Sequence, residues 1–210
     1  LRLRHRLEKH KLAQEMFKTV NALLEQRGLI LRSGTLVDAT LIAAPSSTKN
    51  KDKARDPEMH QTQKGKQWYH GMKAHTGTDA HFGLVHTLRC TAANVHDVVE
   101  ANSLLHGDET DVFADAGYQG ADDRPDAVQG KRWHIAMKRS KRKALDQSKP
   151  RGQLLEQLEQ VKSRIRAKVE HPYRVLKCQF GYVKVRYRGL MKNAQQLHTL
   201  FALGNLWTVR

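Results

Sequence analysis

The segment Thr35–Ala43, TLVDATLIA, is the stretch on which the expected fold depends. It is rich in β-branched and aliphatic residues, which favour a buried strand. Asp38 stands in the middle of this strand, where an acid is disfavoured. Because side chains alternate along a strand, Asp38 would share one face with Leu36 and Thr40. The aliphatic neighbours point to a special role for this acid, although an aspartate on a solvated strand face is the simpler alternative.

The next part of the chain predicts a loop followed by two strands. Residues 45–67 are polar and basic, without periodicity, and we expect a mobile, exposed basic loop there. Met72–Thr76 and Leu84–Cys90 then predict an antiparallel pair of strands joined by a turn at Asp79–Gly83.

A second acid ends another apolar run. Asp111–Ala114 predicts a strand, and Asp115 follows it at the start of a glycine turn. Sheets of α/β proteins bind ligands beyond the carboxyl ends of their strands, whereas turn chemistry is the alternative explanation for this acid. Asp97 and Glu100 resemble a capping box that opens a short helix before this strand. Arg132–Met137 predicts one further strand.

Helical periodicity marks both ends of the chain. Lys11–Arg27 carries one apolar stripe and ends at Gly28. A long helix is expected from Gln153 to Phe180 and another from Asn193 to Trp207. The long helix has an apolar stripe that we expect to face the core, formed by Leu154, Leu158, Val161, Ile165 and Val169. This order of elements is that of a ribonuclease-H-like fold, an α/β fold with a mixed sheet flanked by helices.

A third acid, Glu170, lies on the long helix. At about 100° per residue, Arg166 and Lys177 stand within roughly 40° of Glu170, so the three share one face beside the apolar stripe. Pro172 predicts a kink. A solvated ion pair between Arg166 and Glu170 is the simpler interpretation.

Carboxylates that converge from different elements are what two-metal phosphoryl transfer requires, because Mg²⁺ prefers oxygen ligands. We therefore expect Asp38, Asp115 and Glu170 to hold two Mg²⁺ ions, with Mn²⁺ as a substitute.

The charge of the chain indicates a polyanionic partner. The formal net charge is +16 and the pI is about 10.1. Lys131–Lys192 alone contains 19 Lys or Arg against 4 Asp or Glu. Such a field suits nucleic acid, while a solvated basic face and an anionic membrane surface are the alternatives. We expect DNA contacts at the basic run of Lys138, Arg139, Lys141, Arg142 and Lys143.

The two cysteines, Cys90 and Cys178, form no CxxC pair, which favours a reducing, cytoplasmic setting. No apolar run reaches the ~18 residues of a membrane span, so we expect no membrane partner.

Five separated blocks carry a family resemblance: LVDATLIAAPSSTKNKD, QWYHGMKAHTGTDA, TAANVHD, FADAGYQG and RAKVEHPYRVLKCQFGY. Together they resemble the catalytic region of bacterial insertion-sequence transposases of groups four and five, from about Arg32 to Arg210. The resemblance implies a DDE triad of Asp38, Asp115 and Glu170, and an Arg-x3-Glu-x6-Lys signature at Arg166, Glu170 and Lys177. It also implies the ribonuclease-H-like fold. Ser163 replaces the tyrosine of the fuller signature.

By this resemblance, the protein cuts DNA at transposon ends and joins the freed 3′-hydroxyls to target DNA, as a homodimer in a synaptic complex near the nucleoid. Arg166 and Lys177 would bind DNA phosphates near the transposon end. Residues 34–210 would form the catalytic domain, and residues 1–33 a helical remnant of an upstream segment. A cleavage-only or inactive DNA-binding remnant is the alternative. Because no complete helix-turn-helix precedes Asp38, we expect the chain to bind DNA with little preference for any DNA sequence.

Some residues stay outside the expected catalytic set. Trp68, Tyr69 and Trp133 lie beside basic residues and would suit stacking on an unpaired base, although core or rim packing is the simpler role. His96 and Asp97 match a block of the family, but a helix cap explains Asp97.

Overall fold

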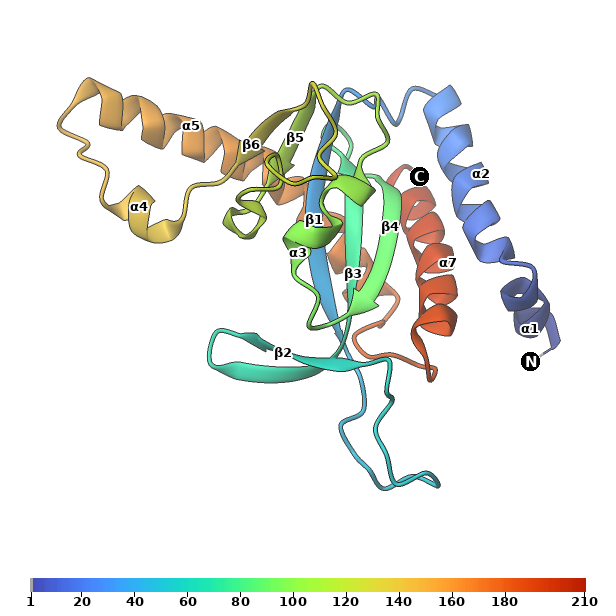
Figure 1. Cartoon of the computed structure of the whole chain (residues 1–210). Coiled ribbons are helices and arrows are strands. Elements are labelled where there is room, and N and C mark those ends of the chain that lie inside the picture. Colours follow the sequence, from blue (N-terminus) through green and yellow to red (C-terminus); the bar gives the residue numbers. More distant parts are fainter. Residues whose placement is uncertain (1) are drawn as a thin grey trace.

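The computed structural model describes residues 2–210, with side chains from His5 onward (Figure 1). The strands are β1 (Gly34–Ala43), β2 (His60–Lys64), β3 (Gln67–Asp79), β4 (Val85–Ala92), β5 (Asp111–Ala114) and β6 (Arg132–Ile135). The α-helices are α1 (Arg2–Lys9), α2 (Leu12–Gln26), α3 (Asp97–Glu100), α4 (Arg139–Lys143), α5 (Pro150–Arg166), α6 (Glu170–Arg174) and α7 (Leu190–Thr208). Short non-α helical turns are η1 (Asn102–Leu104), η2 (Ala116–Tyr118), η3 (Ala167–Val169) and η4 (Val175–Gln179).

These strands form one mixed sheet. The central strand β1 pairs antiparallel with β3 and parallel with β5, and β6 extends the parallel part beyond β5. β4 pairs with the second half of β3, while β2 forms a hairpin with its first half. The expected mixed sheet flanked by helices, consistent with a ribonuclease-H-like fold, is confirmed.

The two faces of the sheet bury different side chains. Leu36 and Met72 pack in a core with Phe17 of α2, Leu176 of η4 and other residues of the C-terminal helices. Val37 packs on the opposite face with residues from η1, β5 and η2. Successive residues of β1 therefore point to opposite layers, as the alternation of a strand requires.

Helix α2 is packed on the sheet layer. It lies beside α7 (Figure 1), and Phe17 and Leu24 are buried while Leu12 remains partly exposed. Asn21 Nδ2 donates to the carbonyl of Val85 at 3.2 Å, and Asn205 Nδ2 donates to Asn21 Oδ1 at 2.8 Å. Residues from the N-terminal segment thus complete the core beside β4.

The structure corrects the expected loop of residues 45–67, because its last part is strand β2. Its side chains are mostly exposed and polar on both faces, so the strand leaves no hydrophobic alternation in the sequence. Gly65, with φ of +64°, supplies the backbone conformation of the two-residue turn into β3. β3 also begins earlier than expected, at Gln67, because its first residues pair with β2.

The expected helix from Gln153 to Phe180 is divided. α5 ends at Arg166, and η3, α6 and the π-type turn η4 follow. Pro172 lies in the first turn of α6, where its missing N–H costs no internal helical bond. The expected kink is therefore an interruption spread over both sides of the proline.

The apolar stripe of this segment is also corrected in part. Val169 is buried, but Leu154, Leu158 and Val161 of α5 are exposed. Gly152 and Glu159 are the residues of α5 that are buried. The periodicity indicated an amphipathic helix but not which side would be covered.

No helix in residues 2–210 is both long and apolar enough to cross a membrane.

Candidate active site

The strand register brings the first two acids together. In the parallel pairing of β1 with β5, Val37 lies opposite Ala114, so Asp38 and Asp115 follow at neighbouring positions. Val37 and Ala114 are buried in the same core. Because side chains alternate, the two acids point to the other face, which α5 and α6 cover.

Asp38 is half-buried in the sheet. One oxygen, Oδ1, accepts a hydrogen bond from the backbone N–H of Ala39 at 2.8 Å. Burial raises the pKa of this carboxyl from 3.8 to about 7, and the charges of Asp115 and Glu170 act in the same direction. The Ala39 hydrogen bond and the charge of Arg166 lower it. The charges of Asp115, Glu170 and Arg166 therefore all act on the carboxyl group of Asp38.

Asp115 is held by the turn that follows β5. Its Oδ1 accepts a hydrogen bond from the N–H of Gly117 at 2.8 Å, so it caps η2. A Cβ at position 117 would lie 3.0 Å from the same oxygen. Glycine therefore allows the close approach that fixes the carboxylate.

Glu170 is exposed at the start of α6, on the rim of a cleft of about 700 Å³. The cleft is lined by all five residues predicted for the catalytic site and its signature, namely Asp38, Asp115, Arg166, Glu170 and Lys177. Residues 2–210 contain no ion pair between Arg166 and Glu170. The described residues therefore do not show the surface ion pair of the simpler interpretation of Glu170.

The cleft has a basic wall that the sequence predicted only in part. Lys64 of β2 and Arg174 of α6 line it together with Arg166 and Lys177. Burial lowers the pKa of Lys177, the charge of Lys64 lowers it further, and Glu170 opposes the shift. Arg174 follows Glu170 by one helical turn, a spacing that could have identified it. Lys64 could not be identified, because β2 was expected to be a loop.

Tyr173 lines the cleft beneath these charges. It is buried, and its hydroxyl lies 2.7 Å from Oγ1 of Thr76, the residue of β3 that pairs with Asp38. Burial, followed by the charge of Asp38, raises the pKa of Tyr173 well above 10. Tyr173 is thus a neutral phenol beside the acids.

The donor chemistry of the cleft fits a hard divalent cation. Asp38 and Asp115 are neighbouring carboxylates without an ion-pair partner in the described part of the chain, and carboxylate oxygens are preferred Mg²⁺ ligands. The fit is incomplete in this conformation: across residues 2–210, no three His, Cys, Asp or Glu side chains are gathered closely enough to hold an ion. Glu170 would have to turn in from the rim.

The basic run at residues 138–143 lies outside the cleft. It forms α4 and the residue before it, with Lys138, Arg139, Lys141 and Lys143 exposed. Arg142 instead makes a two-pronged contact with Glu156 of α5, with nitrogen–oxygen distances of 2.9 and 2.6 Å. Four of the five basic residues of this run are therefore exposed to solvent, and the fifth, Arg142, attaches α4 to α5.

The residues that were left outside the expected catalytic set lie in different environments. Trp68 is exposed on the β2–β3 hairpin, whereas Trp133 packs against the core that contains Val37. Asp97 makes no capping bond, so the predicted capping box is wrong. Its carboxylate lies 2.9 Å from Nζ of Lys73, because the neighbouring strand β3 supplies a stronger partner than the helix terminus.

Comparison with known families assigns most of the chain to one family. The family model described as transposase DDE domain matches residues 30–206, a range that contains Asp38, Asp115 and Glu170. No solved structure matches the chain.

Proposed function

The chain belongs to the transposase DDE domain family, and on this premise we propose that it cuts DNA at transposon ends and transfers the freed 3′-hydroxyls to target DNA. The family supports a role in transposition, and the insertion-sequence groups four and five are the finer assignment that the sequence blocks favour. The observation that carries the proposal is the placement of Asp38 and Asp115 side by side, with Glu170 on the rim of the same cleft.

Asp38 and Asp115, with Glu170 turned inward, would hold two Mg²⁺ ions, for which Mn²⁺ can substitute. When bound, the ions would supply neutralisation of the phosphate charge and a more acidic attacking hydroxyl. Arg166 and Lys177 would hold phosphates beside the scissile bond.

Cleavage and joining use the same arrangement. Water attacks the phosphodiester, and the bond to the 3′-oxygen breaks, which leaves a 5′-phosphate and a free 3′-hydroxyl. This hydroxyl then attacks a phosphodiester of the target strand, where a new bond forms and the 3′-hydroxyl of the cut target strand is released. The half-buried position of Asp38 and the buried Tyr173 close the inner side of the cleft to bulk solvent.

The partners follow from this chemistry. The exposed lysines and arginine of residues 138–143 would bind DNA phosphates outside the cleft, and two copies would hold a pair of transposon ends. Because DNA is the proposed substrate, we place the protein at the bacterial nucleoid, in the cytoplasm.

The test compares Asp115→Asn with Asp123→Asn, an exposed aspartate of the following loop. With Mg²⁺ and DNA that carries the terminal inverted repeats, Asp115→Asn should lose about 10³-fold or more in cleavage rate, because several kcal/mol of charge stabilisation disappear. Asp123→Asn should cleave like the parent.

Three outcomes would contradict parts of the proposal. Undiminished cleavage by Asp115→Asn would show that the acid is wrongly assigned. Cleavage without joined products would favour a nuclease. DNA binding by the parent protein without any cleavage would favour an inactive remnant.

A further inference from the structure

The segment of residues 44–59 between β1 and β2, which we call the β1–β2 loop, carries positive charges at alternate positions. These residues, all exposed, are Lys49, Lys51, Lys53 and Arg55. Figure 1 shows the loop extending beyond one end of the sheet, well apart from α4. Its cations therefore lie outside the basic run at residues 138–143, and they also lie outside the lining of the catalytic cleft.

The acids of the β1–β2 loop attach it to the amino end of α7. Asp56 Oδ2 accepts a hydrogen bond from the N–H of Gly189 at 2.7 Å, and Glu58 Oε2 accepts one from the N–H of Leu190 at 2.6 Å. The free N–H groups and the dipole of a helix N-terminus stabilise carboxylates placed there. These two acids therefore have a role in folding.

The lysines of the loop have no such role. The third acid, Asp52, forms an ion pair with Arg188. Lys49, Lys51 and Lys53 form no ion pair within residues 2–210. The acids of the loop bind the rest of the protein while its lysines meet solvent, so the loop presents a positive field outward.

The shape of the β1–β2 loop is held by its own hydrogen bonds. Asn50 Nδ2 donates to the carbonyl of Ala54 at 2.8 Å, and Asn50 Oδ1 accepts from the N–H of Ala54 at 3.3 Å. Lys53, with φ of +46°, lies in the turn that these bonds close. Arg55 Nε donates to the carbonyl of Ser46 at 2.8 Å. Because the backbone that carries the cations is already arranged, a ligand would lose less binding energy in ordering it.

The β1–β2 loop and the catalytic cleft lie along the same face of β1. Asp38, Thr40 and Ala44 share this face because side chains alternate along the strand. Thr40 lines the cleft, and Ala44 lines a hollow of about 310 Å³ beside the loop. At about 3.3 Å per residue, Ala44 lies roughly 13 Å beyond Thr40, which is the length of about four base pairs of DNA.

Further cations connect the cleft with the loop. Arg55, Arg186 and Arg188 line the hollow. Lys177 lines the cleft, and the chain that follows it reaches Arg186 through Lys184, which is exposed and bridges to the last residue of β1. A duplex with one phosphate in the cleft would pass these residues if its axis followed β1.

We propose that the β1–β2 loop is a second DNA-binding surface, which contacts the duplex backbone roughly four base pairs from the phosphate held in the cleft. The inference rests on the proposed function, because DNA in the cleft determines the path of the duplex. Lysine contacts phosphates as a flexible point charge and reads no bases there, so the loop binds DNA of any sequence. It holds the substrate in place without selecting it.

The test compares two triple variants that lose the same charge. The loop variant combines Lys49→Gln, Lys51→Gln and Lys53→Gln. The control variant changes three exposed lysines of the α1–α2 segment and combines Lys9→Gln, Lys11→Gln and Lys18→Gln. Each set contains one lysine in the left-handed backbone region, with φ of +46° at Lys53 and +53° at Lys11, so the two sets are also matched in backbone strain.

DNA binding is titrated at several salt concentrations, with the full chain, a chelator and a random-sequence duplex of about 30 base pairs. The loop variant should bind roughly tenfold more weakly or worse, and its slope of log affinity against log salt should fall by about 2 to 3, since each lost phosphate contact removes about 0.9. The control variant should keep nearly the slope of the parent. Equal changes in the two variants would overturn the proposal, because net charge alone would then explain them.

Lysine acetylation of the parent protein covers the case in which the loop variant fails to fold. Bound DNA should protect Lys49, Lys51 and Lys53 from an acetylating reagent, as read by mass spectrometry. The control lysines should react as they do without DNA. Unchanged reactivity of the loop lysines in the DNA complex would overturn the proposal.

These binding measurements separate the loop from the chemistry of the cleft. Cleavage of DNA by a protein whose loop lysines stay unprotected would refute the loop surface and leave the proposed function standing. Protected loop lysines without cleavage would support the loop surface and count against the proposed function. A parent protein that binds no DNA would overturn both.

Discussion

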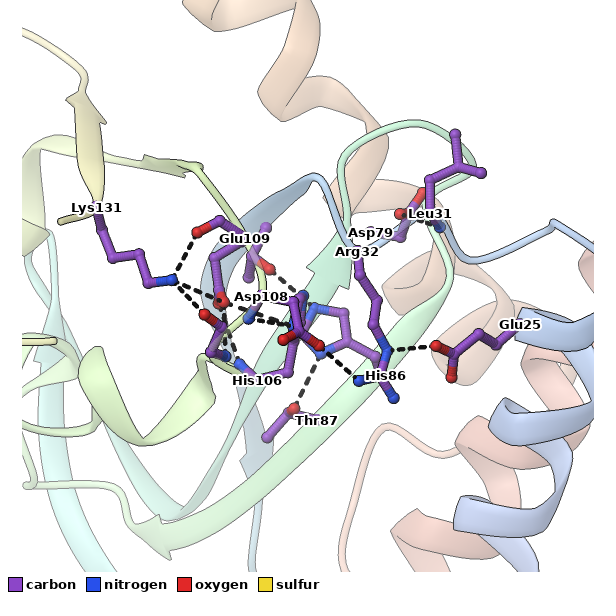
Figure 2. A network of polar contacts seen from close by, with 12 residues as sticks. Glu25, Leu31, Arg32, Asp79, His86, Thr87, His106, Asp108, Glu109 and Lys131 are labelled. Carbon is purple, nitrogen blue, oxygen red and sulfur yellow. Dashed lines mark hydrogen bonds and ion pairs between the residues drawn. The ribbon is translucent and has the colours of Figure 1, made fainter. Parts of the chain in front are cut away.

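The carboxylates at the two ends of the β1–β5 strand pair differ in whether they have ion-pair partners. Beyond the carboxyl end of β5, Asp38 and Asp115 face a cleft without an ion-pair partner in the described chain. Before the amino ends of both strands, acids and bases are joined in the network of Figure 2. There Arg32 binds Glu25 and Asp108, each at 2.9 Å.

The centre of this network is a buried acid. Glu109 accepts hydrogen bonds from the N–H groups of His106 and Gly107 at 3.0 and 2.7 Å, and lies 3.8 Å from Nζ of Lys131 (Figure 2). Lys131 also donates to the carbonyl of Glu109 at 2.7 Å. Paired charges at this end join α2 and the residue before β6 to the loop that precedes β5, whereas unpaired acids at the other end leave room for a ligand.

The largest expected effect on stability is the loss of Glu109. Glu109→Gln removes the charge that faces buried Lys131 and one of two acceptors, so the free energy of unfolding should fall by about 3 to 5 kcal/mol. Chemical denaturation measures this difference. The control, Asp108→Asn, breaks an exposed pair with Arg32 and should change stability little. Equal losses in both variants would show that burial does not distinguish the two contacts.

Asp38→Asn tests the opposite end and should stabilise the metal-free protein. Because the pKa of Asp38 is raised from 3.8 to about 7, its contribution favours folding at low pH and is lost as the pH rises through about 7. Above pH 7, the variant should therefore gain on the order of 1 to 3 kcal/mol, an estimate reduced for the partial solvent exposure of Asp38.

Thermal unfolding at pH 8, with a chelator and then with Mg²⁺, checks the prediction. The parent should gain more stability from Mg²⁺ than Asp38→Asn does, since binding cations stabilises the folded state by mass action. A metal-free variant that is less stable than the parent would contradict the view that burial of the charged Asp38 carboxylate costs stability.

Particular residues show how far the sequence could predict this arrangement. The aliphatic neighbours of Asp38 identified its strand, and the turn after Ala114 identified the strand end that carries Asp115. The sequence could not give the register of β1 against β5, because pairing depends on the packing of the whole sheet. It could not reveal β2 either, since polar residues on both faces leave no hydrophobic period.

The exposed apolar row of α5, formed by Leu154, Leu158 and Val161, marks a second limit. A periodic apolar row predicts an amphipathic helix, but whether that row faces the core or a partner depends on which other contacts orient the helix. In α5 these contacts are polar, through Glu156 and Glu159. Arg142 shows the same limit, because its neighbours in the basic run remain exposed while it binds Glu156.

The pH dependence of folding stability tests the end of the β1–β5 strand pair that carries the network of Figure 2. Burial lowers the pKa of His86 to about 3, and its ring nitrogens lie 3.1 Å from Thr35 Oγ1 and 2.9 Å from Thr87 Oγ1. As the pH falls below 6.5, the unfolded chain takes up a proton before the folded chain, so stability falls from about pH 6.5 towards pH 3.

From pH 7 to pH 5 this loss should be about 1 to 2 kcal/mol. His86→Gln, which keeps polar atoms but does not titrate, should flatten the dependence, and the exposed His81→Gln should leave it unchanged. Denaturation curves across this range give the comparison. An unaltered slope in His86→Gln would place the acid sensitivity elsewhere.

The smallest expected effects lie on α4, where a paired and an unpaired charge are neighbours. Lys141 is exposed and Arg142 is bound to Glu156. If unpaired cations bind DNA and paired ones support the fold, Lys141→Ala should lower DNA affinity a few-fold and reduce the salt dependence by about one phosphate contact. Arg142→Ala should affect DNA affinity less and instead lower the melting temperature slightly, because α4 loses its attachment to α5.

Binding titrations at several salt concentrations, with melting curves of the same samples, separate the two residues. Identical losses of affinity would show that DNA draws Arg142 away from Glu156, and the contrast between paired and unpaired charges would then hold only for the network around Glu109.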